Sequence, residues 1–118
     1  VIDAIGGSPL LIEKGKIKVK SCGSYLCQRH PRSAVGIKKN GDVMLVQVDG
    51  RDAGSRGMTL VQLARAMKAR GAAWAMNLDG GGSTTMFVDG KVVNKPSDKE
   101  GERKVSDAIL VTLRTKKK

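Results

Sequence analysis

Aromatic residues are scarce in this sequence, with one Phe, one Trp and one Tyr among 118 residues. Proteins that bind single-stranded nucleic acids stack the bases on several aromatic side chains, and this chain has few to offer. The formal net charge of +11 would otherwise point to such a partner. We therefore expect no nucleic-acid partner, and we assign the positive charge to solvated strand faces or to a surface that faces a phosphate-containing polymer.

Long apolar runs are also missing, since none approaches the roughly 18 residues that a membrane-spanning helix requires. The first residues form no basic and then apolar leader. The chain does not begin with Met, and its opening letters VIDAIGG already have the pattern of a strand. We expect a single domain over residues 1–118 that lacks its N-terminal portion, and no transmembrane segment within it.

Histidine and cysteine are equally rare, with His30 as the single histidine and Cys22 and Cys27 as the two cysteines. A structural zinc site needs four ligands, commonly in two pairs, and the sequence has no second pair. The metal requirement therefore stays open, and no pattern points to a cofactor. The two cysteines fit a local disulfide in an exported protein and, equally, two free thiols.

Glycine is abundant, with 15 residues, and three of them are consecutive in the segment NLDGGGSTTM, residues 77–86. Glycine loses more conformational freedom on folding than any other residue, so a run of three is unfavourable unless the backbone requires it. One explanation is a tight turn. The other is a loop whose amides approach an anionic ligand closely. Serine-hydrolase, phosphate-loop and dinucleotide-binding patterns are absent, so the run has none of these common explanations.

Hydrophobic periodicity predicts one helix, over residues 60–70. Its first turn has the spacing of a capping box, in which Thr59 and Gln62 satisfy each other's backbone amides, and Gly71 supplies the stop. One face carries an apolar stripe at helical spacing: Leu60, Leu63, Ala64 and Met67.

The other apolar runs have the length and alternation of strands. Asn40-Gly41 and Asp89-Gly90 each separate two such runs and predict two β-hairpins. Besides the two short arms of the second hairpin, the predicted strands cover residues 1–5, 9–12, 16–20, 34–39, 42–48, 73–78 and 108–113. We expect a single α/β domain of the mixed α+β kind, in which one main crossover helix packs on a mixed β-sheet with hairpins.

Two aspartates follow the strands that flank the helix. The strand over 43–48, the helix and the strand over 73–78 form a β-α-β unit, which almost always joins parallel strands by a right-handed crossover. Asp49 and Asp79 come directly after these strands, so both carboxylates are expected at the same edge of the sheet, where ligands commonly bind. The alternative is that both Asp-Gly pairs are turn dipeptides.

Basic residues near these positions have two interpretations each. Arg51, two residues after Asp49, fits a salt bridge or a bidentate phosphate ligand. The segment RHPRS places Arg29, His30 and Arg32 within four residues, which fits a solvated basic loop or part of a site. The His30 imidazole fits a structural donor as well as a proton carrier.

Seven segments, taken in order, resemble the phosphodiester glycosidase family and together cover Ile5 to Val111. They are IGGSPLLIEKGK, RHPRSAVGI, VDGR, GMTLVQLA, NLDGGGSTTM, VVNKPSD and GERKVSDAILV. The resemblance implies a hydrolase that cleaves the glycosidic bond of a sugar-1-phosphodiester, such as one of N-acetylglucosamine. It also implies a sugar-phosphate or anionic glycan substrate and a bacterial protein outside the cytoplasm, in cell-envelope or exopolysaccharide metabolism.

The resemblance also implies roles for the matching positions. The substrate is anionic and its glycosidic bond breaks through an oxocarbenium-like state, so the site needs cations for the phosphate and a carboxylate for the sugar. Asp79 is the first candidate for nucleophile or general base, Asp49 is the second, and His30 is an assisting group. The substrate-binding candidates are three arginines, the glycine run and the two hydroxyl residues after it: Arg32, Arg51, Arg103, Gly80, Gly81, Gly82, Ser83 and Thr84.

The sequence departs from the family pattern in two places. An Asn- and Gly-rich segment that the family has upstream is not in this chain. Asp107 stands where the family has Asn, which adds a negative charge near Arg103. A non-catalytic module that binds anionic glycan or a phosphate-containing polymer is the alternative function.

Overall fold

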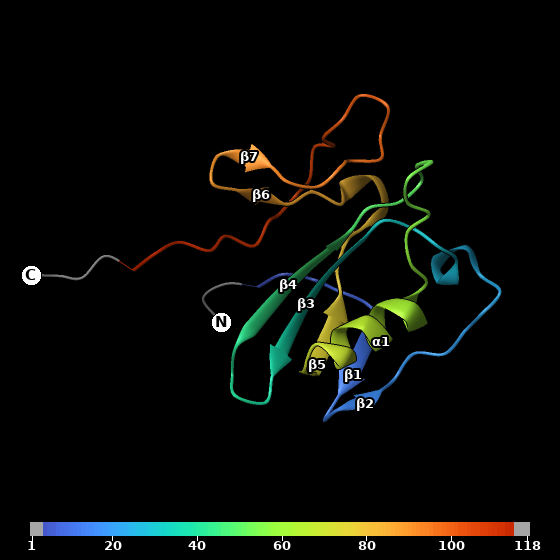
Figure 1. The fold of residues 1–118 in the computed structure, drawn as a ribbon, viewed down its shortest axis with the longest axis vertical. Helices are drawn as coiled ribbons and strands as arrows, with labels where there is room; N and C mark the ends of the chain where they lie inside the picture. Colours follow the sequence, from blue (N-terminus) through green and yellow to red (C-terminus); the bar gives the residue numbers. More distant parts are fainter. Residues whose placement is uncertain (1–3, 115–118) are drawn as a thin grey trace, which may run out of the picture.

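The computed structural model describes residues 4–114 and contains a five-stranded sheet with a helix across one face (Figure 1). The strands lie in the order β2-β1-β5-β3-β4. Their bounds are β1 (Leu10–Glu13), β2 (Lys16–Ile17), β3 (Arg32–Lys38), β4 (Val43–Val48) and β5 (Ala72–Asn77). A separate hairpin of β6 (Phe87–Val88) and β7 (Lys91–Val92) lies beyond the end of the sheet.

The predicted α+β class and the crossover helix are confirmed, and the strand pairing adds a detail. β4 and β5 point in the same direction, as predicted, but β3 lies between them and is antiparallel to both. Each neighbouring pair in the described sheet is therefore antiparallel, where the sequence predicted a mixed sheet. The reason is that β3 pairs with β4 through the Asn40-Gly41 hairpin and uses its other edge for β5.

The helix α1 (Leu60–Ala69) begins as the sequence predicted. The Thr59 hydroxyl accepts a hydrogen bond from the Gln62 amide at 3.1 Å, and the Gln62 side chain accepts one from the Thr59 amide at 2.9 Å. Gly71 has a φ of 95°, the left-handed conformation that ends many helices. All four residues of the predicted apolar stripe are buried.

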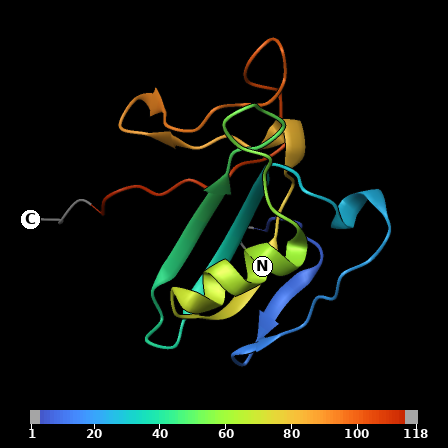
Figure 2. The ribbon, with the colours of Figure 1, turned by 45° about the vertical axis from the view of Figure 1, so that its right-hand side comes forward.

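The core lies between α1 and one face of the sheet, and Figure 2 shows the helix lying across that face. Leu11 and Ile12 of β1 supply its largest sheet side chains, and both are fully buried. Small residues in β3 and β5 let the helix approach closely: a Cβ at Gly36 would come within 2.9 Å of the Met67 terminal methyl group. Within residues 4–114 no helix has the length and apolar character needed to cross a membrane.

Both predicted hairpins are present, whereas the strand predicted over 108–113 is wrong. No strand forms there, and Leu110 and Leu113 are 85% and 97% exposed. Alternating apolar residues become a strand only when a neighbour accepts their backbone hydrogen bonds, and this segment has no such neighbour among the described residues. Likewise, the predicted strand over 16–20 pairs only at Lys16–Ile17, and in the one over 1–5 only residues 4 and 5 are described, outside any strand.

Candidate active site

A cleft of about 630 Å³ lies at the edge of the sheet where β4 and β5 end and β3 begins. This edge is the one at which the sequence placed both aspartates. The chain around Arg32 pairs with the end of β4 at Val48, and Ala34 pairs with the end of β5 at Asn77. Eight of the eleven predicted site residues line the cleft: His30, Arg32, Arg51, Asp79, Gly80, Gly81, Gly82 and Arg103.

Asp79 lies just beyond the C-terminal end of β5 and is exposed to the cleft. The residue before it, Leu78, donates its amide to the Ser33 carbonyl at 2.8 Å, which fixes the direction in which the chain leaves the sheet. The hydrogen bond and ion pair with Asp98 raise the pKa of Arg103, and the negative charge of Asp79 adds a smaller contribution. The Asp79 carboxylate and the Arg103 guanidinium therefore belong to the same cleft.

Three consecutive glycines occur in this run because the space around them excludes side chains. Gly81 has a φ of 57°, and a Cβ there would come within 3.0 Å of the Arg51 guanidinium. A Cβ at Gly82 would overlap both the Arg103 guanidinium and the Asp98 carboxylate. The run therefore lets two arginines lie directly against the backbone.

The backbone amides of the run are partly committed to the turn η2 (Gly81–Ser83). The Gly81 amide donates to the Pro31 carbonyl at 2.9 Å, and the Ser83 and Thr84 amides close the turn. The Gly80 and Gly82 amides have no acceptor within the described part of the chain. These two amides are uncommitted donors beside the cleft; that they bind an anionic ligand stays a prediction.

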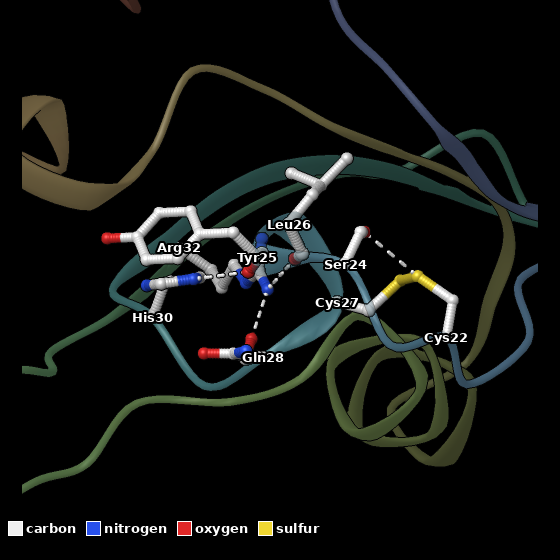
Figure 3. Close-up of a disulfide and its surroundings, with 8 residues drawn as sticks. All are labelled: Cys22, Ser24, Tyr25, Leu26, Cys27, Gln28, His30 and Arg32. Atoms are coloured by element: carbon white, nitrogen blue, oxygen red, sulfur yellow. Dashed lines mark hydrogen bonds between the residues drawn. A yellow bond between two sulfur atoms is a disulfide. The ribbon is translucent and has the colours of Figure 1, made fainter.

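Arg32 is a buried cation at the start of β3, only 3% exposed. Its Nε donates to the Met58 carbonyl at 2.9 Å. Its Nη2 donates to the Leu26 and Gln28 carbonyls at 2.7 Å each, as Figure 3 shows. Burial lowers the pKa of Arg32, and the charge of Arg51 lowers that pKa further. None of the ion pairs within residues 4–114 includes Arg32, so it supplies a fixed positive charge behind the cleft.

His30 is buried and links Arg51 to the loop before β3. Its Nε2 lies 2.7 Å from the Tyr25 carbonyl, which only accepts, and its Nδ1 lies 3.3 Å from Arg51 Nη2, which only donates. These partners require the tautomer with the proton on Nε2. The same Arg51 Nη2 also donates to the Tyr25 hydroxyl at 3.2 Å, so one nitrogen of the guanidinium makes both contacts.

The loop before β3 contains the two cysteines, which form a disulfide (Figure 3). Of the two alternatives that the sequence left open, the structure therefore contains the local disulfide. It closes a short turn, η1 (Tyr25–Cys27), that carries Tyr25 and Leu26 to the cleft. The ring of Tyr25 lies against that of His30, with centroids 4.4 Å apart.

Arg103 reaches the cleft from the long loop after β7 and is held by Asp98. Its Nε donates to Asp98 Oδ2 at 2.7 Å, and its Nη2 donates to Oδ1 at 2.9 Å. This two-bond contact lowers the pKa of Asp98 and raises that of Arg103. Because both side chains are exposed, solvent screens the attraction, and the main effect of the pair is to orient Arg103 over Gly82.

The remaining predicted site residues lie elsewhere. Asp49 lines a separate hollow of about 800 Å³ beside β4, where its Oδ1 accepts the Lys95 amide at 2.8 Å. Thr84 is 1% exposed and lies beneath the turn, and Ser83 is not among the residues that line the cleft. Within the described ranges no group of three or more His, Cys, Asp or Glu side chains is placed to hold a metal ion.

Two functional candidates escaped the sequence analysis. Tyr25 was part of a segment without periodicity, and its position between two cysteines was the only available signal. Asp98 belongs to a polar loop in which no sequence feature distinguishes it from the other acidic residues. Tyr25 owes its place to a contact with Arg51, 26 residues away in the sequence, and Asp98 to a contact with Arg103 within an irregular loop. Sequence patterns reveal neither contact.

Comparison with known proteins gives a consistent result. Residues 1–112 match a protein family described as phosphodiester glycosidase. A bovine protein named N-acetylglucosamine-1-phosphodiester alpha-N-acetylglucosaminidase is 39% identical over 111 residues, which cover 82% of this chain and 21% of that protein. The zebrafish enzyme of the same name, whose catalytic domain was solved as auto-inhibited by its pro-peptide, superposes with a TM-score of 0.69 at 35% identity, over 80% of this chain and 35% of that one.

A solved protein from Burkholderia pseudomallei, described as a "Putative exported protein", superposes with a TM-score of 0.62 at 46% identity. This match covers 64% of the present chain and 14% of that protein. The chain spans only 13% to 21% of the length of the curated relatives that it matches. The similarity therefore concerns one part of much longer proteins.

Proposed function

Because this chain belongs to the phosphodiester glycosidase family, we propose that it hydrolyses the glycosidic bond of a sugar-1-phosphodiester. One observation carries the proposal: the Asp79 carboxylate shares a cleft with three arginines and the amides of a glycine run. The names of the bovine and zebrafish relatives support N-acetylglucosamine as the sugar. The sugar, like the activity of the longer protein, is part of the proposal.

The phosphate is bound on the arginine side of the cleft. Arg51 and Arg103 are exposed there, and guanidinium groups bind phosphate oxygens through paired hydrogen bonds. The Gly80 and Gly82 amides supply further donors, and buried Arg32 adds positive charge behind them. Because these groups are fixed before substrate arrives, they stabilise negative charge on the leaving phosphate without reorganising.

Asp79 acts on the sugar side. In the reaction the bond between C1 and the phosphate oxygen breaks, its electron pair leaves with the phosphate, and a water oxygen becomes attached to C1. Asp79 stabilises the positive charge that develops on the sugar and serves as nucleophile or as the base that takes the water proton. A retained or inverted configuration at C1 distinguishes these two roles.

Within the described residues the cleft has no second free carboxylate of the kind that glycosidases usually have. Asp49 lies in a different hollow, and the Asp98 carboxylate is occupied by Arg103. Glycosidases use a second carboxyl group chiefly to protonate a poor leaving group. A phosphate already bound by arginines leaves without that assistance, so the cleft needs only Asp79. His30 then positions Arg51 and moves no proton.

We also place the chain outside the cytoplasm, in envelope or exopolysaccharide metabolism of a bacterium. The Cys22–Cys27 disulfide supports the compartment, because disulfides persist in oxidising environments. The description of the related protein from Burkholderia pseudomallei supports it as well.

The test is release of free N-acetylglucosamine from the methyl phosphodiester of α-N-acetylglucosamine-1-phosphate. Asp79→Asn should abolish release, whereas Asp89→Asn should leave it unchanged, because Asp89 belongs to the exposed turn between β6 and β7. The assay is run on this chain and on a form extended at the N-terminus, since this chain spans only 13% to 21% of the length of its curated relatives. Full release by Asp79→Asn in the active form would contradict the proposal.

A non-catalytic anion-binding module is the second candidate. One observation favours it: among the described residues the cleft has one free carboxylate, where glycosidases commonly use two. Saturable binding of the phosphodiester by both forms without any release of sugar would establish this function instead.

A further inference from the structure

We propose that the disulfide-closed loop, residues 22–27, is a positioning element of the cleft that fixes Arg32 through its main-chain carbonyls. The consequence for anion binding rests on the proposed function, because it takes the cleft to be a phosphate site. The statement about Arg32 stands on contacts of the structure alone (Figure 3).

The first step is that the loop has little apolar packing. No residue of the turn η1 is buried, and Tyr25 and Leu26 are 67% and 50% exposed. Cys27 is half-buried against the core. A short segment with so little apolar packing opens readily, so the covalent link between Cys22 and Cys27 constrains it together with its hydrogen bonds to His30, Arg32 and Arg51.

The second step is that Arg32 depends on this segment. Arg32 donates three hydrogen bonds. Two go to the carbonyls of Leu26, at the end of the loop, and Gln28, just after it. The third goes from Nε to the carbonyl of Met58, in the chain just before α1. One end of the guanidinium is therefore anchored to the folded core and the other end to the disulfide loop.

The third step extends the dependence to Arg51. The Tyr25 carbonyl accepts from His30 Nε2, and the Tyr25 hydroxyl accepts from Arg51. Opening the loop removes both partners at once. His30 then loses the contact that fixes its tautomer, and with it the Nδ1 acceptor for Arg51.

The Nη and Nε protons of Arg32 can be measured separately, so the two anchors of its guanidinium can be tested one at a time. In the oxidised chain, proton NMR of side-chain guanidinium groups should show Arg32 Nη protons that are slow to rotate and to exchange with water. Reduction, or the Cys22→Ser/Cys27→Ser variant, should speed both processes at least about tenfold. The Arg32 Nε proton and the backbone amides of α1 should keep their signals, which shows that the fold persists.

The binding measurement uses inorganic phosphate as the probe. Opening the loop by reduction of the disulfide should weaken the affinity of the chain for phosphate roughly threefold to tenfold, as expected when charged hydrogen-bond donors lose their fixed geometry. In an Arg32→Lys background, reduction of the disulfide should weaken phosphate binding less, because the lysine lacks the guanidinium group that the loop carbonyls position. Such non-additivity is the signature of a residue that acts through another.

Two results would overturn the inference: Arg32 Nη protons that are unchanged by reduction, or equal effects of reduction in the wild-type and Arg32→Lys backgrounds. A chain that does not bind phosphate even when oxidised would count against the proposed function, while the Arg32 signals still decide the role of the loop. Reductant added to the double-serine variant is the control and should change neither measurement.

Discussion

The chain has two corners that look alike in sequence and differ in structure. Asp49-Gly50-Arg51 and Asp79-Gly80-Gly81 each follow a strand, and the two strands point in the same direction to the same edge of the sheet. Yet Asp79 faces the arginine cleft, whereas Asp49 faces away and binds the Lys95 amide. A place at the sheet edge therefore brings a carboxylate near a site, and the path of the next few residues decides whether it enters.

The difference lies in the loops that follow. After Asp79, the turn η2 folds back over the start of β3, with the Gly81 amide on the Pro31 carbonyl. After Asp49, the chain turns so that Ser55 donates to the Asp49 carbonyl at 2.6 Å. Of the Asp49 corner, only Arg51 lines the cleft. The Asp49 corner thus contributes a cation and the Asp79 corner a carboxylate.

The sharpest test of this comparison exchanges each aspartate for asparagine. Asp79→Asn should lower kcat at least about a hundredfold, the usual range for a lost catalytic acid or base. Asp49→Asn should stay within about threefold of the wild type, since an asparagine oxygen still accepts the Lys95 amide. Sugar-release kinetics measure both. Equal losses in the two variants would mean that Asp49 joins the chemistry despite its position.

A second test adds one methyl group to each corner. Gly82→Ala should displace the Arg103 guanidinium and lower kcat/KM about tenfold, because the new Cβ occupies the space of the Arg103–Asp98 pair. Gly54→Ala in the Asp49 corner is the matched control, since its nearest neighbour lies 4.0 Å away. Phosphate titration and sugar release read the outcome. Wild-type kinetics in Gly82→Ala would show that the position of Arg103 is unimportant.

Arg51, which links the corners, allows function to be separated from stability. Its φ of 57° is costly for any residue with a Cβ. Arg51→Gly should therefore be more stable than Arg51→Ala, by about 1 kcal/mol, while both bind phosphate more weakly than the wild type. Denaturant unfolding compares the stabilities. The strain argument fails if the alanine variant is as stable as the glycine variant.

The smallest expected effect is that of acid on Asp98. Arg103 holds the pKa of Asp98 below its ordinary value, so the folded form favours the ionised carboxylate. This contribution is complete above the ordinary pKa and is lost as the pH falls through the lowered one. Carbon NMR of the carboxyl group should follow the titration, and Arg103→Gln should move it back up. An unchanged midpoint in that variant would exclude Arg103 as the cause.

Local signals in the sequence predicted local structure well. The capping box of Thr59 and Gln62, the stop at Gly71 and the Asn40-Gly41 hairpin are all confirmed, because each depends on residues a few positions apart. The strand over 108–113 failed for the opposite reason, since a strand requires a neighbour that its own letters do not specify. Its exposed Leu113 shows that apolar character alone does not order a segment.

The candidate site divides along the same line. The sequence predicted that Asp49 and Asp79 lie at the same edge of the sheet, with the glycine run beside Asp79, because strand direction follows from the crossover rule. It did not predict that Arg32 would be buried beneath the surface, since its three partners are carbonyl groups that any residue provides. Main-chain acceptors leave no trace in the letters of a sequence.

That use of main-chain acceptors also bears on how the cleft can change during evolution or in the laboratory. The loop holds Arg32 through the carbonyls of Leu26 and Gln28, so the side chains at these two positions are not needed for that contact. Leu26 is half exposed and lines the cleft. Randomising position 26 should therefore diversify the entrance for different sugars while the cation behind it stays in place.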